Sequence, residues 1–379
     1  MNGPINGPAL AAERERPYSG GLMGPGGGTA RAAKMQTTSE RSAYLVLGMH
    51  RSGTSATAQL LALAGAELPD NVMPGDEHNA KGYFEPWKIS VFNDQRLRAG
   101  ATAWDDPFNL PYAPLAADDE AAWRERAIAL FRAEFGEALH PLLKDPRVSV
   151  LLPMWREVLD AVQMPARVVI PVRGPLAVAG SLSRRDAFPV EKSVLLWTIY
   201  MLAAEAHTRD LPRAFVSYDG LLSDWRGQVA AMEKAHGAAL PRLSERAAEQ
   251  IDGFLTKDLR HNDGDGDLAA VPLVGALAQG VLDWFNAAAA GQSPDHAVLD
   301  RAAAKIAEMK AQMGVFVSPV TSALDSTRAE LLYERQLAEV ERKRMDALES
   351  ELALLRQERA RIEAVVDTVT AQAEAIDQV

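Results

Sequence analysis

A buried strand followed at once by a glycine-bearing turn and a helix constrains the fold of this chain more than any other feature. The stretch YLVLGMHRSGTSATAQLLALAG runs from Tyr44 to Gly65. Its beginning, AYLVLG (43–48), has the apolar run of a buried strand, and Gly53 opens a helix that continues through Leu63. In such a unit, free backbone N–H groups and the helix dipole converge on one spot, which favours an anion there.

The turn has the glycine spacing of a nucleotide-hydrolysing phosphate loop but not its lysine. Thr54 follows the second glycine of the pair Gly48 and Gly53, where such a loop carries lysine. Arg51 supplies a positive charge from inside the loop instead. The hydroxyl donors of the loop are Ser52, Thr54 and Ser55. We therefore expect the loop to hold a phosphate-like group without the lysine that bridges the β- and γ-phosphates of ATP. The alternative is a plain strand–turn–helix with a solvated arginine.

Strands alternate with helices from about residue 42 to residue 320. ARVVIPVR (166–173) and RAFVSY (213–218) are rich in β-branched and aromatic residues and are predicted strands. Helices are predicted for PLAVAGSLSRR after the first of these strands, and over 190–207 and 221–237. This order predicts an α/β fold in which helices flank a parallel sheet and ligands bind at the carboxyl ends of the strands.

The last segment has a different pattern, with no glycine or proline from Thr327 onward. TRAE gives a capping box in which Thr327 pairs with Glu330. Nine of the ten residues that then follow at alternating spacings of three and four are apolar: Met345, Leu348, Leu352, Leu355, Arg359, Ile362, Val366, Val369, Ala373 and Ile376. This seam predicts a coiled coil and self-association, or pairing with a partner helix. A long helix folded back on the globular domain is the alternative.

These patterns divide the chain into three predicted segments. Residues 1–41, rich in Gly, Pro, Ala and Arg, are predicted to be a disordered tail. Residues 42–322 form the predicted α/β domain, and residues 323–379 the C-terminal helix. A later start of the native chain, at Met23 or Met35, is an alternative interpretation of the tail.

Charge and cysteine content exclude several functions. The formal net charge of −11 argues against general binding of nucleic acid, which needs a basic surface. The absence of cysteine excludes disulfides, thiolate metal sites and thiol catalysis. With no run of about eighteen apolar residues and no secretory signal, the sequence predicts a cytoplasmic protein without a membrane span.

Two motifs together resemble the sulfotransferase superfamily. HRSGTS resembles its 5′-phosphosulfate loop, in the Arg-Ser-Gly-Thr form of the branch that includes tyrosylprotein sulfotransferases. In that family an arginine at a strand end and a serine eight residues later grip the 3′-phosphate of the donor, and Arg173 and Ser181 have this spacing. The resemblance implies a sulfotransferase fold related to P-loop NTPases. It also implies 3′-phosphoadenosine 5′-phosphosulfate (PAPS) as donor, transfer of its sulfuryl group to an acceptor hydroxyl, and no required metal.

Further stretches between residues 44 and 262 resemble the same family. GYFEP (82–86), FND (92–94) and KDPR (144–147) are similar to patterns of bacterial and carbohydrate-type sulfotransferases. By analogy this suggests a saccharide or glycan as acceptor, although protein tyrosine, an antibiotic scaffold or a small alcohol would leave the same donor motifs.

Two more stretches resemble the family's nucleotide contacts. VSYDGLL resembles the stretch whose tyrosine lies near the adenine, but only Tyr218 matches, because Asp219 and Gly220 replace its acidic pair. KDLRHN stands where the family has a basic loop over the 3′-phosphate. It lacks the Arg-Lys-Gly form of that loop, so the resemblance extends only to Lys257 and Arg260 as candidate contacts.

A base must accept the proton of the acceptor. Glu85 is the first candidate, because the superfamily often places a carboxylate after the first helix and because the aromatic neighbours of Glu85 would partly desolvate it. His50 is the second, since histidine titrates near neutrality and the loop places it near the sulfuryl group. Asp145 is the third. Glu85 as an ion-paired carboxylate and His50 as a packing residue are the alternatives.

Other polar residues have two interpretations each. Lys144 and Arg147 are either acceptor or phosphate contacts or members of a structural ion pair. Trp104 with Asp105 and Asp106 is either a sugar-binding surface or a buried tryptophan beside two loop aspartates. Trp197 and Tyr200 lie on an amphipathic helix and are predicted to belong to the core.

Two other functions compete with the sulfotransferase. A P-loop kinase of a nucleotide or small molecule shares the strand–loop–helix, but the missing lysine and the pair Arg173 and Ser181 count against it. An inactive scaffold that acts through its coiled coil is the other, and the intact loop residues argue against it.

Overall fold

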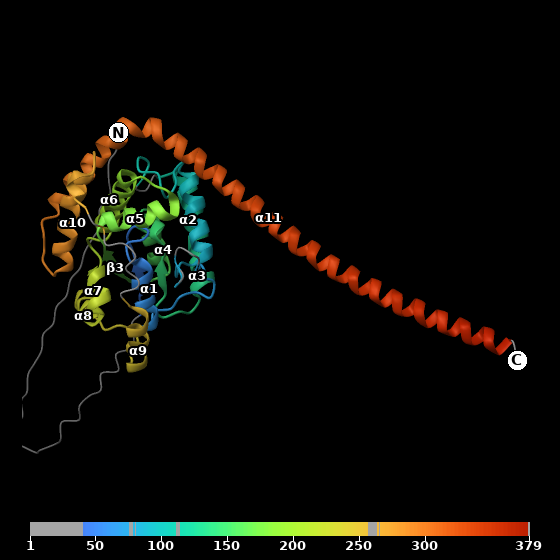
Figure 1. Cartoon of the computed structure of the whole chain (residues 1–379). Coiled ribbons are helices and arrows are strands. Elements are labelled where there is room, and N and C mark those ends of the chain that lie inside the picture. Colours follow the sequence, from blue (N-terminus) through green and yellow to red (C-terminus); the bar gives the residue numbers. More distant parts are fainter. Residues whose placement is uncertain are drawn as a thin grey trace, which may run out of the picture. The chain divides into compact units, whose positions relative to one another are not determined.

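The computed structural model describes residues 41–75, 79, 81–110, 114–256, 264 and 266–377, and side chains only as far as residue 369 (Figure 1). The predicted disordered tail, apart from Arg41, lies outside the described residues.

Four parallel strands form one sheet in the order β2-β1-β3-β4. The strands are β1 (Ala43–Val46), β2 (Leu142–Lys144), β3 (Ala166–Val172) and β4 (Arg213–Ser217). Val46 pairs with Lys144 on one side and Val169 on the other. The sheet, with helices on both faces, confirms the predicted α/β fold. The strand β2 was not predicted, because its three residues are too few to show a period.

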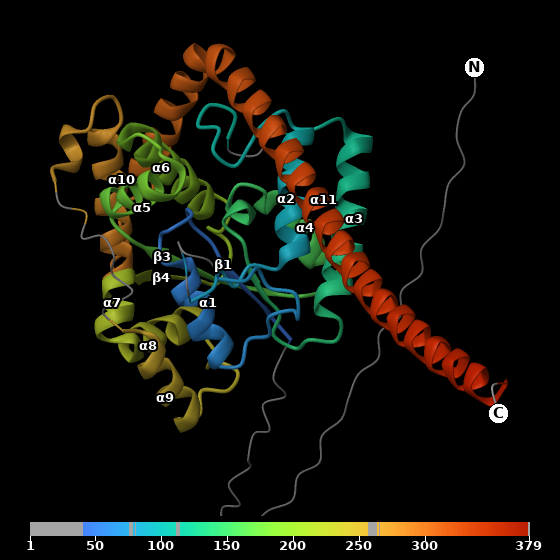
Figure 2. The same ribbon diagram turned by 45° about the vertical axis from the view of Figure 1, so that its right-hand side comes forward.

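Helices cover both faces of the sheet, and Figure 2 shows α5 and α6 on one side with α7, α8 and α9 on the other. The helices are α1 (Thr54–Leu63), α2 (Trp87–Ala99), α3 (Ala117–Phe135), α4 (Leu152–Ala161), α5 (Pro175–Asp186), α6 (Val190–Ala206), α7 (Tyr218–Ser223), α8 (Trp225–His236), α9 (Glu245–Phe254), α10 (Gly275–Ala289) and α11 (Ala297–Asp377), with short 3₁₀ turns at Pro146–Ser149 and Leu268–Ala270. Alternate residues of β1 enter the two cores. Leu45 packs in the core with α4, α5, α6 and α10, whereas Tyr44 packs in the core with α1, α8 and α9.

The predicted helices α1, α5 and α6 agree with the structure, but the helix predicted over 221–237 does not. It is two helices, α7 and α8, separated at Asp224. The Asp224 side chain accepts a hydrogen bond from the Gly227 N–H and so caps α8. A local capping bond at the aspartate therefore competes with a continuous helix here.

The C-terminal helix begins at Ala297, well before the predicted start. Thr327 lies inside α11, where its hydroxyl donates to the Ala323 carbonyl, so the predicted capping box is wrong. The helix runs through Gly314 and also through Pro319, a residue type that removes one backbone hydrogen bond and bends a helix. The predicted boundary between residues 322 and 323 thus falls within a helix.

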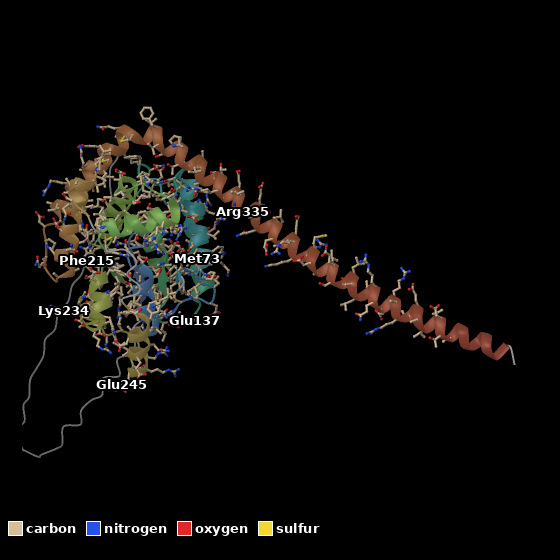
Figure 3. All side chains as sticks on the ribbon, viewed as in Figure 1. Met73, Glu137, Phe215, Lys234, Glu245 and Arg335 are labelled. Carbon is tan, nitrogen blue, oxygen red and sulfur yellow. The ribbon has the colours of Figure 1, made fainter. Side chains whose placement is uncertain are left out.

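The apolar seam of α11 is exposed wherever its side chains are described. Met345, Leu352 and Val369 are among its residues that have about half of their surface exposed or more, at 56%, 47% and 58%. Side chains project around α11 on all sides, as near Arg335 (Figure 3). Side chains this exposed are not covered by the globular domain, so the folded-back alternative is wrong for Met345, Leu352 and Val369, and self-association stays a prediction.

Within the described residues, no single helix has the length and apolarity needed to cross a membrane. Only α5 and α6 taken together pass that test, by length and composition alone, and they are bent by 117° at the break between them.

Candidate functional site

The loop between β1 and α1 is wound tightly at the carboxyl edge of the sheet. Gly48, Arg51 and Gly53 have positive φ angles of 133°, 69° and 92°. Such a conformation costs a residue with a side chain about 1–3 kcal/mol, and Arg51 adopts it. The Gly48 N–H donates to the Ser149 hydroxyl at 2.8 Å, which ties the loop to the 3₁₀ turn after β2. Backbone strain held by the surrounding structure is a common feature of functional loops.

The two phosphate motifs meet at this edge although they lie far apart in the chain. The Arg51 Nε donates to the Ser181 hydroxyl at 2.7 Å, and the two residues are 130 positions apart. The Arg173 Nη1 donates to the Arg51 carbonyl at 3.0 Å. Because β1 and β3 are neighbours in the sheet, the residues that follow them are brought together. The structure thus gathers Arg51, Arg173 and Ser181 at one point.

Tyr218 closes one side of the loop. A Cβ added to Gly53 would lie 2.4 Å from a ring carbon of Tyr218, so only glycine allows this contact and the positive φ. The Arg173 guanidinium lies 4.6 Å from the centre of the same ring, in a cation–π contact. Among the loop hydroxyls, Ser52 and Thr54 are buried, and the Ser52 hydroxyl has no hydrogen-bond partner among the described residues.

A hollow of about 300 Å³ lies beside Arg173 at the N-terminus of α5. Its lining includes Arg173, Gly174, Leu176, Ala177, Asp219 and Gly264. A Cβ on Gly264 would lie 2.8 Å from the Ala177 N atom, so the chain passes close over the start of α5. The candidate residues Lys257 and Arg260 lie outside the described residues. The free N–H groups at the start of α5 and the arginine make this hollow suitable for an anion.

A lysine from β2 reaches the loop from the side. The Lys144 Nζ lies 2.6 Å from the Glu85 Oε1, 2.8 Å from the Tyr83 carbonyl oxygen and 3.4 Å from the Ser55 hydroxyl. Burial lowers the pKa of the Lys144 ammonium below its ordinary value, and Glu85 opposes this shift. Lys144 therefore links the phosphate loop to the first candidate base, which is itself 3% exposed and ion-paired.

Three carboxylates surround Arg147. Its guanidinium lies 2.6 Å from Asp94, 2.9 Å from Asp145 and 3.7 Å from Glu85. Burial alone would lower the pKa of Arg147, but these carboxylates together raise it well above its ordinary value. Asp145, the third candidate base, also accepts from Asn93 at 2.8 Å, so both its oxygens are engaged by the protein. The ion-pair interpretation of Arg147 is confirmed.

His50 is buried with its ring against Trp104. The two ring centres lie 4.6 Å apart, and Nε2 has no hydrogen-bond partner among the described residues. Burial, and then the positive charges of Arg147 and Arg185, hold the pKa of His50 well below its ordinary value. The imidazole is therefore neutral near pH 7 and can accept a proton only weakly.

A cavity of about 440 Å³ brings the first two candidate bases together. Its lining comprises His50, Met73 (labelled in Figure 3), Pro74, Gly75, Tyr83, Glu85, Trp87, Trp104, Arg147, Arg185 and Asp186. Sequence reasoning missed Arg185, although it follows Ser181 by four positions on α5 and so shares its helix face. Met73, Pro74 and Gly75 gave no sequence signal. The cavity has room for a ring-sized molecule beside the loop.

Of the two interpretations of Trp104 with Asp105 and Asp106, the aspartates match the buried one, whereas Trp104 lines the cavity and its role in sugar binding stays a prediction. Both aspartates are buried: Asp105 pairs with Lys192 at 2.8 Å, and Asp106 accepts from the Phe108 N–H at 2.9 Å. The Trp104 ring stacks on Phe188 and makes a tilted contact with the His50 ring, at 56° between the ring planes. The prediction that Trp197 and Tyr200 belong to the core is confirmed, since both side chains are fully buried.

No protein-family model and no curated protein sequence matches this chain. Solved structures do match. The sulfotransferase domain of the Synechococcus PCC 7002 olefin synthase is 15% identical with a TM-score of 0.37, over 65% of this chain and 95% of that one. The sulfotransferase domain from the curacin biosynthetic pathway is 12% identical with a TM-score of 0.34, over 70% and 97%. A sulfotransferase from Mycobacterium tuberculosis H37Rv is 14% identical with a TM-score of 0.35, over 64% and 76%.

Proposed function

We propose that this chain is a sulfotransferase that moves the sulfuryl group of PAPS to an acceptor hydroxyl, with a saccharide or glycan as the acceptor. The observation that carries the proposal is the bond between Arg51 and Ser181. Two motifs that each resemble one half of a PAPS site converge on it from adjacent strands. A chance resemblance of two separated motifs gives no reason for them to meet.

On the donor side, the loop N–H groups and Arg51 would hold the 5′-phosphosulfate. Arg173, Ser181 and the hollow at the start of α5 would hold the 3′-phosphate, since a planar guanidinium and a hydroxyl suit phosphate oxygens. Tyr218 would lie near the adenine. In this role Arg51 neutralises charge on the leaving phosphate as its bond to sulfur breaks.

Lys144 would supply the positive charge that the loop lacks at the position of the P-loop lysine. Its ammonium enters from β2 and lies 3.4 Å from the Ser55 hydroxyl, beside the place where the loop would hold the bridging oxygen. A lysine from the neighbouring strand β2 would add positive charge at the reacting group. Its ion pair with Glu85, at 2.6 Å, orients that carboxylate.

On the acceptor side, the cavity of about 440 Å³ would hold the acceptor hydroxyl against Glu85. Glu85 takes the proton as the hydroxyl oxygen forms its bond to sulfur and the bond from sulfur to the donor phosphate breaks. His50 is the second candidate for this base, and its unpartnered Nε2 is then a hydrogen-bond acceptor for the same hydroxyl. Charge placement and orientation supply the rest of the catalysis.

The test compares two serines on one helix. Adenosine 3′,5′-bisphosphate at about 100 times its Kd should stabilise the wild-type chain by about 2.7 kcal/mol in thermal unfolding. Ser181→Ala should lose most of this stabilisation, whereas Ser183→Ala, at an exposed position two residues later, should keep it. Equal stabilisation of both variants would remove Ser181 from the donor site, and no stabilisation of the wild type would contradict the proposed function.

We also propose that α11 pairs with the α11 of a second copy through the seam from Met345 to Val369. The support is the run of exposed apolar side chains at heptad spacing, since such side chains are normally buried against a partner helix.

A further inference from the structure

The loop of residues 101–110, between α2 and α3, forms a wall of the acceptor cavity through Trp104. The same loop lies under α11 near the start of the exposed part of that helix (Figure 2). We name it the wall loop. Two regions that the sequence separates by some two hundred residues therefore share one short segment.

Polar contacts join α11 to the wall loop and its base. The Ser318 hydroxyl donates to the Asp106 Oδ1 at 3.0 Å. The Arg98 Nε, at the end of α2 where the wall loop begins, lies 2.6 Å from the Asp325 Oδ2. The Arg328 guanidinium lies 3.6 Å from the Asp105 carboxylate. Ser318, Asp325 and Arg328 are spaced by seven and three residues and so lie on one face of α11, which contacts three positions along the segment.

The contact between α11 and the wall loop is not densely packed. The helix approaches the wall loop closely at Gly314, where a Cβ would lie 3.3 Å from the Phe108 carbonyl oxygen. Beside that point a hollow of about 690 Å³ separates the two, lined by Ala101, Phe108 and residues of α11 from Lys310 to Ser326. Because this hollow separates them, α11 holds the wall loop there mainly through polar contacts, whereas Phe108 and Leu110 anchor the loop in the core.

The position of the wall loop determines where Trp104 lies in the cavity. The Tyr200 hydroxyl donates to the Trp104 carbonyl at 2.8 Å, and Lys192 pairs with Asp105 at 2.8 Å, which fixes the loop on its α6 side. The Trp104 ring lies against His50, and both rings line the acceptor cavity. A shift of the wall loop on its α11 side therefore moves the surface that faces the acceptor.

We propose that α11 is a positioning element of the acceptor cavity, in which Ser318, Asp325 and Arg328 hold the wall loop so that Trp104 stays against His50. Only the description of this cavity as an acceptor site rests on the proposed function. Since the same helix carries the apolar seam, pairing of α11 with a second copy would order the element that holds the wall loop.

The test uses the ring of His50 as a local reporter in the full chain. The ring current of Trp104 shifts the proton signals of the neighbouring imidazole, so the NMR signal of His50, assigned with His50→Gln, reports the distance between the rings. Asp325→Asn removes the charge that pairs with Arg98 and should move this signal toward the position of an unstacked histidine. Amide hydrogen exchange over residues 101–110 should rise at least tenfold in the same variant.

Matched variants separate positioning from general loss of structure. Glu339→Gln breaks an ion pair with Arg342 on the same helix, away from the wall loop, and should leave the His50 signal unchanged. Asp325→Glu should restore the signal, and Ser318→Ala should move it in the same direction as Asp325→Asn but less. An unmoved His50 signal in both Asp325→Asn and Ser318→Ala would overturn the proposal. Equal movement of the other histidine signals would also overturn it.

Titration of the same samples with adenosine 3′,5′-bisphosphate keeps the two proposals distinct. The proposed donor site lies at the carboxyl ends of β1 and β3, whereas Asp325 pairs with Arg98 at the end of α2, so the bisphosphate should bind Asp325→Asn and the wild type equally. Failure of the wild type to bind would contradict the proposed function, while the His50 comparison would still decide whether α11 positions the wall loop.

Discussion

The loop that carries Arg51 and the cavity that contains Glu85 meet at Ser55 and Lys144, yet different forces hold them. The loop is fixed by backbone geometry at the ends of two adjacent strands and by a few hydrogen bonds to neutral groups. The cavity is fixed by buried charges, above all the cluster of Arg147 with its carboxylates.

This difference separates the expected effects of mutations. A buried ion pair that loses one partner leaves an uncompensated charge, so changes on the cavity side should affect stability as well as turnover. Changes in the loop should mainly affect nucleotide affinity, because in the proposed function its backbone N–H groups and Arg51 hold the 5′-phosphosulfate.

The largest effect is expected at the base. Glu85→Gln should lower the rate at which PAPS yields adenosine 3′,5′-bisphosphate by about 10²–10⁴-fold, because general-base catalysis is lost. The affinity for the bisphosphate should stay within about threefold of the wild-type value, since Glu85 lies on the cavity side. A loss below about tenfold in turnover would exclude Glu85 as the base, and a larger loss in His50→Gln would point to histidine instead.

The next effect is on stability. Arg147→Met leaves Asp94, Asp145 and Glu85 without their shared cation and should lower the free energy of unfolding by about 3–5 kcal/mol. Urea denaturation measures this loss in the free energy of unfolding. Arg156→Met breaks an exposed pair with Asp210 and should cost less than about 1 kcal/mol. Similar losses in the free energy of unfolding for the two variants would show that the buried cluster around Arg147 stabilises the fold no more than an exposed ion pair does.

A smaller effect on stability is expected from the pH-dependent protonation of His50. Burial lowers the pKa of His50 in the folded chain, so below its unfolded pKa of about 6.5 the unfolded state binds a proton that the folded state does not. Stability should therefore fall as pH drops from 7 to 5, with His50 contributing up to about 1.4 kcal/mol per pH unit. The stability of His50→Gln should fall less steeply than that of the wild type over the same pH range. Equal slopes in both proteins would contradict a buried neutral imidazole.

The smallest effect on the site should come from removing the seam. Deletion of residues 336–379 removes Met345 to Val369 but keeps Ser318, Asp325 and Arg328. Sedimentation should show the full chain as an oligomer and the shortened chain as a monomer, with unchanged affinity for adenosine 3′,5′-bisphosphate. A monomeric full chain would refute self-association through α11.

The strands and helices of the proposed donor side could be predicted from sequence because their patterns are local. A buried apolar run, a glycine and a helix start identify β1, the loop and α1, and the spacing from Arg173 to Ser181 follows from one strand end and one helix. Their meeting requires only that β1 and β3 be neighbours, which is a common outcome in a parallel sheet.

The cavity side depends on contacts that no local pattern contains. Its walls come from the segment around Met73, the wall loop and α5, and only the folded chain brings them together. The burial of Asp105 and Asp106 could not be decided from sequence, because charged residues are usually exposed and their partners, Lys192 and the Phe108 N–H, come into contact only on folding. The false capping box at Thr327 has a similar origin, since a Thr-x-x-Glu pattern also fits the interior of a long helix.

The most direct test of the donor site is isothermal titration with adenosine 3′,5′-bisphosphate, beside ATP with magnesium, for the wild type and Arg173→Ala. We expect micromolar binding of the bisphosphate by the wild type and its loss in the variant, because Arg173 lies between the hollow at α5 and the phosphate loop. Binding of ATP with magnesium, without binding of the bisphosphate, would contradict the sulfotransferase and favour a kinase. Binding of neither would favour a scaffold that acts through α11.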